Sequence, residues 1–187
     1  MDLKDRLKNI YNLTDQELAL TIDQFVPEVL PAKRYFLKEG QISDRLAFIR
    51  SGLLRSFIYN DNADEITTHF FNAGKVLISM ESFNGQKPSK EYIVAIEDSE
   101  LLVATYDKMQ QLIEKVPVWR QIIKDVDEFK FNEQMNRSIR FQTLSATERY
   151  EQLLQNNPEI VQKVALRHIA SYLGIDIATL SRIRKKI

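Results

Sequence analysis

The chain has 187 residues with 26 basic and 26 acidic side chains, and it contains no cysteine. The absence of cysteine excludes disulfides, thiolate zinc sites and cysteine-held iron–sulfur clusters. At zero net charge, any site for a polyanion must come from charge segregated within the chain. No apolar stretch approaches the length of a membrane span, and the opening MDLKDRLKNIYNLTDQEL lacks a signal-peptide apolar region. We therefore expect a cytoplasmic protein that does not bind membranes.

The first predicted element is a helical lead over roughly residues 3–25. Leu3 and Leu7 begin a series of apolar residues at helical spacing, and a second group follows with the same spacing. Between the two groups, Thr14 and Glu17 have the spacing of a capping box, which marks a helix start.

Between Pro27 and about Thr105 the pattern changes to short runs rich in β-branched and aromatic residues. The runs are YFLKEG, LAFIRSGLLRSFIY, EITTHFF, EYIVAIED and ELLVATY. Turn signals such as Gly40 and Ser51-Gly52 separate them. Many short strands with such turns are typical of an antiparallel sandwich or barrel, so we expect a jelly-roll-like β-roll.

A long helix is predicted from about Pro117 to Phe141. Pro117 suits the first turn of a helix, no glycine or proline follows before Pro158, and Ile122 and Val126 begin an imperfect apolar stripe. Such a helix would span roughly 37 Å at about 1.5 Å per residue, and it must pack against something. A second copy of the helix is one partner, which makes it a dimerisation helix. The β segment of the same chain is the alternative.

The C-terminal part carries the most specific pattern. Ser145 and Glu148 predict a capped short helix, and LRHIASYLGIDIATLSRIRKK follows. In a helix-turn-helix the first helix needs a small residue at the closest approach, and the turn favours a positive φ four positions later. Ala170 and Gly174 meet these needs, and Asp176 suits the N-cap of the second helix. The apolar residues spaced to pack the two helices are Ile169, Leu173, Ile175, Leu180 and Ile183.

The second helix of this motif has two distinct faces at about 100° per residue. One face carries Leu180, Ile183 and Ile187, and the opposite face carries Ala178, Ser181, Arg182 and Lys185. Between Ile160 and the last residue, the sequence contains several basic side chains and only one acidic side chain, that of Asp176. The basic residues are Lys163, Arg167, Arg182, Arg184, Lys185 and Lys186. A structural hairpin with a solvated basic end is the alternative, but the combination favours a face that enters the major groove of DNA.

The order of these parts resembles the Crp/Fnr family of bacterial transcription regulators over nearly the whole chain. The stretches that carry the resemblance are LKEGQ at 37–41, FIRSGLLR at 48–55, HFFNAGKV at 69–76 and IASYLGIDIATLSRIRKK at 169–186. It implies an α+β fold with a cyclic-nucleotide-binding-like β-roll sensor domain over 1–116, a long dimerisation helix over 117–143 and a helix-turn-helix DNA-binding domain over 144–187. It also implies a homodimer that binds two-fold symmetric double-stranded DNA and works with RNA polymerase.

The effector site departs from the family pattern. The family's cyclic-nucleotide receptors carry a Gly-Glu pair for the ribose hydroxyl and an Arg-Ser or Arg-Thr pair for the phosphate. Ile78-Ser79 and Lys90-Glu91 occupy these places here, and in a shifted register Glu81 and Lys90 would act instead. A carboxylate such as Glu91 opposes phosphate binding, so we expect an effector other than the usual cyclic nucleotide, or none.

The DNA face departs from the family pattern too. The best-known members place Arg-Glu just after the cap of the second helix, where Ile177 and Ala178 stand here. The resemblance matches a later family arginine with Arg182, our candidate for a bidentate guanine contact. Ser181 and Thr179 are secondary candidates, and Ala178 would meet a thymine methyl. The residues expected at phosphates, which position without specifying, are Arg184, Lys185 and Lys186.

Other classes of function remain open at this point. A small-molecule sensor could dock a protein partner through its C-terminal helices, which would then expose apolar anchors near Arg182. A cyclic-nucleotide-responsive regulator with a divergent pocket is a further alternative. A cupin-like enzyme would need several histidines and a glutamate around a metal, and the two histidines, His69 and His168, lie far apart in the sequence. We expect no enzyme, and we assign no catalytic residue, metal site or cofactor.

Overall fold

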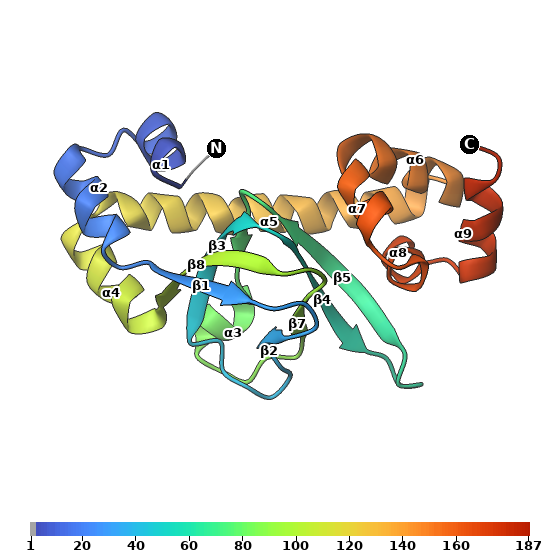
Figure 1. Cartoon of the computed structure of the whole chain (residues 1–187), viewed down its shortest axis with the longest axis horizontal. Coiled ribbons are helices and arrows are strands. Elements are labelled where there is room, and N and C mark those ends of the chain that lie inside the picture. The colour runs from blue at the N-terminus through green and yellow to red at the C-terminus, as the bar shows by residue number, and fades with distance from the viewer. Residues whose placement is uncertain (1–2) are drawn as a thin grey trace. The chain divides into compact units, whose positions relative to one another are not determined.

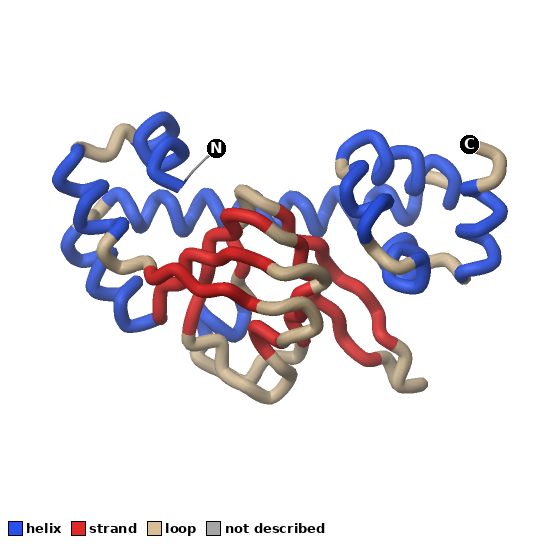
Figure 2. Tube along the Cα trace, viewed as in Figure 1, coloured by secondary structure: helices blue, strands red, loops and turns tan. Residues whose placement is uncertain are grey.

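The computed structural model describes residues 3–187 (Figures 1 and 2). The helices are α1 (Leu3–Tyr11), α2 (Asp15–Ile22), α3 (Met80–Gly85), α4 (Tyr106–Lys115), α5 (Val118–Thr143), α6 (Ala146–Asn156), α7 (Pro158–Lys163), α8 (Leu166–Leu173) and α9 (Ile177–Arg184). The strands are β1 (Val26–Leu30), β2 (Tyr35–Leu37), β3 (Arg45–Ser51), β4 (Leu53–Tyr59), β5 (Glu65–Asn72), β6 (Val76–Leu77), β7 (Tyr92–Ala95) and β8 (Ser99–Thr105).

The strands form two four-stranded sheets, which confirms the predicted β-roll. One sheet has the order β1-β8-β3-β6 and the other β2-β7-β4-β5. The pairings of β8 with β1 and β3, of β3 with β6 and of β2 with β7 are all antiparallel. Gly52 lets β3 turn into β4 at a φ of +108°, and a Cβ there would lie 2.2 Å from the Ser99 hydroxyl. Only glycine fits this turn.

The first sheet is buried on both faces. Side chains alternate along β3, so that Leu46 and Phe48 join one apolar core and Ala47 and Ile49 join another. The second core is the interior of the roll. The first core also contains residues of α1, α4 and the start of α5, including Leu3, and it therefore lies outside the roll.

The described chain forms two compact units. The first contains the residues up to Arg55 together with Phe71–Phe129, and the second contains Ser56–Phe70 and Lys130–Ile187. Helix α5 contributes residues to both units. The division into three segments at residues 116 and 143 stays a prediction.

Most predicted elements are confirmed, with small changes. The long helix runs from Val118 to Thr143 rather than from Pro117 to Phe141. The helical lead consists of two helices, and Thr14 caps the second through the predicted capping box. The short elements β1, β6, α3 and α7 were not predicted. Among residues 3–187, no helix combines the length and the apolar character that crossing a membrane would need.

Candidate DNA interface

A sharp turn joins α8 to α9 and gives the pair its helix-turn-helix geometry. Gly174 adopts a φ of +64°, as predicted, and the Ile175 N–H donates to the Ala170 carbonyl at 3.0 Å. A Cβ on Gly174 would lie 2.7 Å from the ring of Phe141, the side chain that α5 places against the turn. Glycine is therefore required here both for its backbone conformation and for space.

The apolar face of the motif is buried as the spacing predicted. The residues less than a tenth exposed are Ile169, Ala170, Leu173, Leu180 and Ile183. The fifth predicted packing residue, Ile175, is half-buried. Residues 144–187, all of which the structure describes, form helices α6 to α9 and contain no strand. This small core holds α9 rigidly, with its other face exposed.

Hydrogen bonds link three side chains at the start of α9. The Asp176 carboxylate accepts the Thr179 N–H at 2.7 Å as an N-cap, and it accepts the Thr179 hydroxyl at 2.8 Å. The same hydroxyl accepts from the Arg182 guanidinium at 3.0 Å. The backbone N–H of Thr179 also lowers the pKa of Asp176, so that the cap is ionised at neutral pH. Asp176 and Thr179 therefore orient the Arg182 side chain.

The seven predicted DNA-contact residues lie on α9 and its C-terminal end. Thr179 and Ser181 are half-buried, and the exposed members are Ala178, Arg182, Arg184, Lys185 and Lys186. Four of the seven fall on one side of the helix at 100° per residue: Ala178, Ser181, Arg182 and Lys185. The structure thus presents a narrow face with a small side chain, a hydroxyl and two cations.

Arg137 of α5 connects the helix-turn-helix to β5, a role that the sequence did not reveal. Its guanidinium donates to the Thr67 and Thr68 carbonyls of β5 and, at 3.1 Å, to the Tyr172 carbonyl of α8. It also lies over the Tyr172 ring, 4.6 Å from the centroid. One half-buried cation therefore links β5, α5 and α8.

Ser171 makes a second joint between β5 and α8. Its hydroxyl donates to the Glu65 carbonyl at 2.9 Å and accepts the Thr67 N–H at 2.9 Å. The rings of Phe70 and Tyr172 pack beside it with centroids 5.0 Å apart. Strand β5 therefore contacts α8 of the motif through a pair of hydrogen bonds and a ring contact.

The two histidines both lie in this second unit. Burial lowers the pKa of His69 on β5 to about 4, and the nearby cations Lys130 and Arg137 add to the shift. His168 on α8 places its Nδ1 atom 3.8 Å from the Glu65 carboxylate. In the part of the chain that the structure describes, no three His, Asp or Glu side chains gather as a metal site would require.

The residues predicted for the effector pocket lie in separate places. The Ile78 side chain belongs to the core outside the roll, whereas the Ser79 hydroxyl lies 3.4 Å from that of Ser89. Glu81 is exposed and pairs with Lys87 at 2.9 Å and with Lys90 at 3.8 Å. Glu81 and Lys90 are thus neighbours, as a shifted register required, but as a surface ion pair.

Glu91, the remaining predicted pocket residue, is half-buried, and its backbone N–H donates to the Ser89 hydroxyl at 3.1 Å. Ile78 lies in the core outside the roll, whereas Glu81 and Lys90 form an exposed pair. An effector site built from these five residues stays a prediction.

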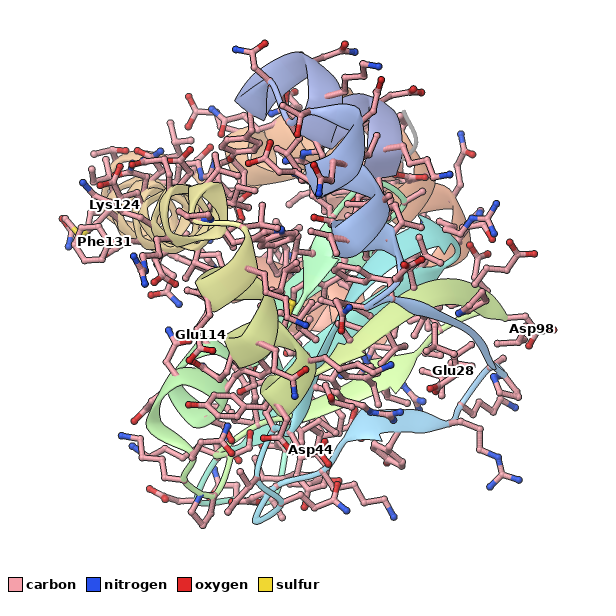
Figure 3. All side chains as sticks on the ribbon, turned by 90° about the vertical axis from the view of Figure 1, so that its left-hand side faces the viewer. Glu28, Asp44, Asp98, Glu114, Lys124 and Phe131 are labelled. Carbon is pink, nitrogen blue, oxygen red and sulfur yellow. The ribbon has the colours of Figure 1, made fainter. Side chains whose placement is uncertain are left out.

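The second half of α5 exposes a line of large apolar side chains. Phe131, Met135 and Ile139 follow one another at intervals of four residues and are 64%, 49% and 50% exposed. Figure 3 shows the Phe131 side chain extending outward from the helix. Ile122 and Val126, which the sequence placed in the same stripe, pack in the first unit instead. The exposed line is therefore shorter than predicted and begins near Phe131.

Comparison with known proteins agrees with this geometry. Residues 27–116 match the family model of the cyclic nucleotide-binding domain. The fumarate and nitrate reduction regulatory protein of Vibrio cholerae is 28% identical over 189 residues, which cover 92% of this chain and 73% of that protein.

Solved structures of regulators share the fold. The c-di-GMP responsive global regulator CLP of Xanthomonas campestris superposes with a TM-score of 0.73 at 18% identity, over 92% of this chain and 91% of CLP. A transcriptional regulator of the crp/fnr family from Eubacterium rectale gives a TM-score of 0.75 at 17% identity, over 99% of this chain and 87% of that one. These matches confirm the fold that the sequence resemblance implied.

Proposed function

We propose that the chain is a transcription regulator of the Crp/Fnr type, which acts as a homodimer and reads a two-fold symmetric DNA site with α9. The matches to the cyclic nucleotide-binding domain and to regulators of this type support the proposal. The observation that carries the proposal is the exposed face of this helix. Its small and polar side chains stand opposite the buried Leu180 and Ile183, and the Asp176–Thr179–Arg182 hydrogen bonds direct the cation at its centre. A protein-docking helix would present apolar anchors at these positions instead.

Each residue of the face has a distinct role. Arg182 donates to the O6 and N7 atoms of a guanine, and Ala178 is small enough to let the backbone approach a thymine methyl. Ser181 and Thr179 make secondary base contacts. The phosphate contacts come from Arg184, Lys185 and Lys186, which set the register of the helix on the duplex. Since Ile177-Ala178 replaces the family's Arg-Glu, the site differs in sequence from the best-known family operator.

The exposed line on α5 forms the dimer contact. Phe131, Met135 and Ile139 give each helix an apolar strip that a second copy of α5 covers. The polar residues Glu133 and Asn136 lie beside the strip and are exposed, which favours one register of pairing. Two copies of α9 are then related by the same two-fold axis as the two halves of the DNA site.

The dimer works in the cytoplasm and with RNA polymerase. Its effector is a molecule other than the usual cyclic nucleotide, or none. The Lys90-Glu91 pair supports this, because it places a carboxylate beside the position where the family's arginine takes the phosphate, and the nearby cation of Lys90 is already paired with Glu81.

Selection of bound sequences from a random duplex pool tests the function. The purified chain should enrich two inverted half-sites whose centres lie about 10 bp, or a multiple of that, apart. As a control, the Arg182→Ala variant selects from the same random pool, and the sequences that it enriches should be less specific. Enrichment of single half-sites would contradict the dimer, and no enrichment at low salt would contradict DNA recognition by α9.

A further inference from the structure

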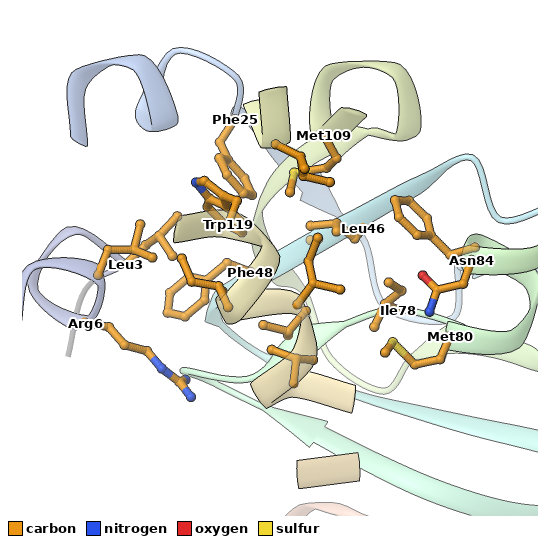
Figure 4. Close-up of a pocket in the computed structure, with 18 of the residues that line it drawn as sticks. Leu3, Arg6, Phe25, Leu46, Phe48, Ile78, Met80, Asn84, Met109 and Trp119 are labelled. Atoms are coloured by element: carbon orange, nitrogen blue, oxygen red, sulfur yellow. The ribbon is translucent and has the colours of Figure 1, made fainter. Parts of the chain in front are cut away.

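The first unit contains an apolar cavity of about 250 Å³. It lies between the outer face of the first sheet and the helices α1, α3, α4 and α5 (Figure 4). For scale, an engineered cavity of about 150 Å³ in another protein stays dry and binds benzene. The space is therefore large enough for a small organic molecule.

The cavity lies on the outer side of the sheet, and of its lining residues only Ala47 belongs to the core inside the roll. Leu46 and Phe48 of β3 line it, whereas Ile49 points to the opposite face of the same sheet. Ile78, placed by sequence counting in a cyclic-nucleotide site, lines this outer cavity as well. A ligand here would accordingly be distinct from one held inside the roll.

The side chains that line the cavity are mostly apolar, so they favour a hydrocarbon ligand. Aromatic rings come from Phe25, Phe48, Phe83 and Trp119, and two methionines, Met80 and Met109, supply flexible apolar surface. Figure 4 shows Phe25, Trp119 and Phe48 close together at the side of the cavity next to Leu3. Water gains few hydrogen bonds in such surroundings, so an apolar molecule would displace it readily.

One charged side chain lies at the edge of the cavity. Of the described residues that line the cavity, Arg6 alone carries a charge. Its guanidinium donates to the Gly74 carbonyl at 2.5 Å, and no carboxylate of residues 3–187 lies within ion-pair distance of it. A guanidinium with spare donors beside an apolar space can hold the carboxylate of a ligand.

We propose that this cavity binds a medium-chain carboxylic acid, with its alkyl chain among the apolar side chains and its carboxylate on Arg6. The ligand would touch Trp119, Ile122, Ile123 and Val126, the residues of α5 that line the cavity. The proposal concerns binding alone and is measured without DNA, so its failure leaves the DNA proposal standing.

Titration with decanoate, followed by intrinsic fluorescence, is the direct experiment. Trp119 is the only tryptophan of the chain; it lines the cavity, and its Nε1–H donates to the Thr21 hydroxyl at 3.0 Å. Decanoate should change the Trp119 emission saturably at one molecule per chain and raise the melting temperature of the full chain. An unsaturable signal or an unchanged melting temperature would overturn the proposal.

Two variants with matched controls assign the site. Val126→Phe fills the cavity and should weaken decanoate at least about tenfold, whereas Val29→Phe, at an exposed position of β1, should not. Arg6→Gln should weaken decanoate about tenfold but leave decanol unchanged, and Lys4→Gln on the exposed side of α1 should have no effect. If Val126→Phe is unfolded by circular dichroism, Ile113→Phe tests the same filling from α4. If a folded variant with a filled cavity binds decanoate with wild-type affinity, the ligand does not bind in this cavity. If the wild-type protein binds decanol and decanoate equally well, Arg6 does not hold the carboxylate.

Discussion

The Arg182 guanidinium donates to the Thr179 hydroxyl at 3.0 Å, one turn earlier on α9. The hydroxyl is itself held by the Asp176 N-cap. A cap that stabilises the helix thus also orients the side chain proposed to read a base. Long cationic side chains lose rotamer freedom on binding, and this arrangement restricts that freedom before the DNA arrives.

Thr179→Val should therefore weaken specific DNA binding while leaving the helix intact. The substitution keeps the shape and the capped N–H but removes the hydroxyl, and we expect a loss of about 0.5–1.5 kcal/mol in binding the selected site. Fluorescence anisotropy measures the loss. Thr143→Val is the control, because that hydroxyl bonds only to the Ile139 carbonyl of its own helix. Equal affinity of Thr179→Val and wild type would show that the hydroxyl does not position Arg182.

Gly174→Ala should lower the free energy of unfolding of the second unit by more than the cost of a positive φ alone. A positive φ costs a non-glycine residue about 1–2 kcal/mol, and here the added Cβ also meets the Phe141 ring at 2.7 Å. Gly40→Ala is the matched control, since Gly40 has a φ of +82° with no neighbour within 4 Å of the added atom. Urea unfolding should show the larger loss at Gly174. Similar losses at the two glycines would mean that Phe141 moves away without cost.

Charge placed in the apolar line of α5 should separate the dimer. Phe131→Glu combined with Met135→Glu puts two like charges from each chain into the contact, where they are desolvated and repel. Light scattering coupled to gel filtration should report the mass of one chain instead of two. Val29→Glu, a change of the same kind at a 67% exposed position, should remain dimeric. A dimer that survives the double change would place the contact elsewhere.

Stability of the second unit should fall as the pH drops from about 6.5 to about 4. The unfolded chain binds a proton at His69 near the ordinary pKa of 6.5, but burial lowers the pKa of the folded protein to about 4. Between these values the unfolded state binds more protons, so acid favours unfolding. The loss from pH 7 to pH 5 is on the order of 2 kcal/mol.

Urea unfolding at the two pH values checks the histidine effect. His69→Gln should remove most of this pH dependence, whereas His168→Gln should keep it. If both variants retain the wild-type dependence on pH, the carboxylates of the chain rather than His69 govern its acid stability.

The helix-turn-helix could be predicted from sequence because its constraints are local. Ala170, Gly174 and Asp176 act within a few residues of one another, and each works through backbone geometry that the residue type alone dictates. The β-roll was predicted for a similar reason, from turns and short runs. Elements such as β6 and α3 were missed because two to six residues carry too little periodicity.

Contacts between distant residues could not be predicted in this way. Arg137 looked like one more polar residue of a long helix, yet it holds carbonyls about 70 and 35 positions away. The cavity gathers residues from α1, β3, α4 and α5, whose common surroundings exist only in the folded chain. Ile78 is an example, since it lies in the core outside the roll and lines this cavity together with residues that are distant in the sequence.

The role of Arg182 is tested most directly by titrating wild type, Arg182→Ala and Lys185→Ala against the selected DNA site and its single-base variants. Arg182→Ala should cost about 1–3 kcal/mol on the selected site and lose its preference at one base pair in each half-site. Lys185→Ala should instead weaken all sequences alike and flatten the dependence on salt. Unchanged affinity and unchanged base preference in Arg182→Ala would contradict the assignment of α9 as the element that reads DNA.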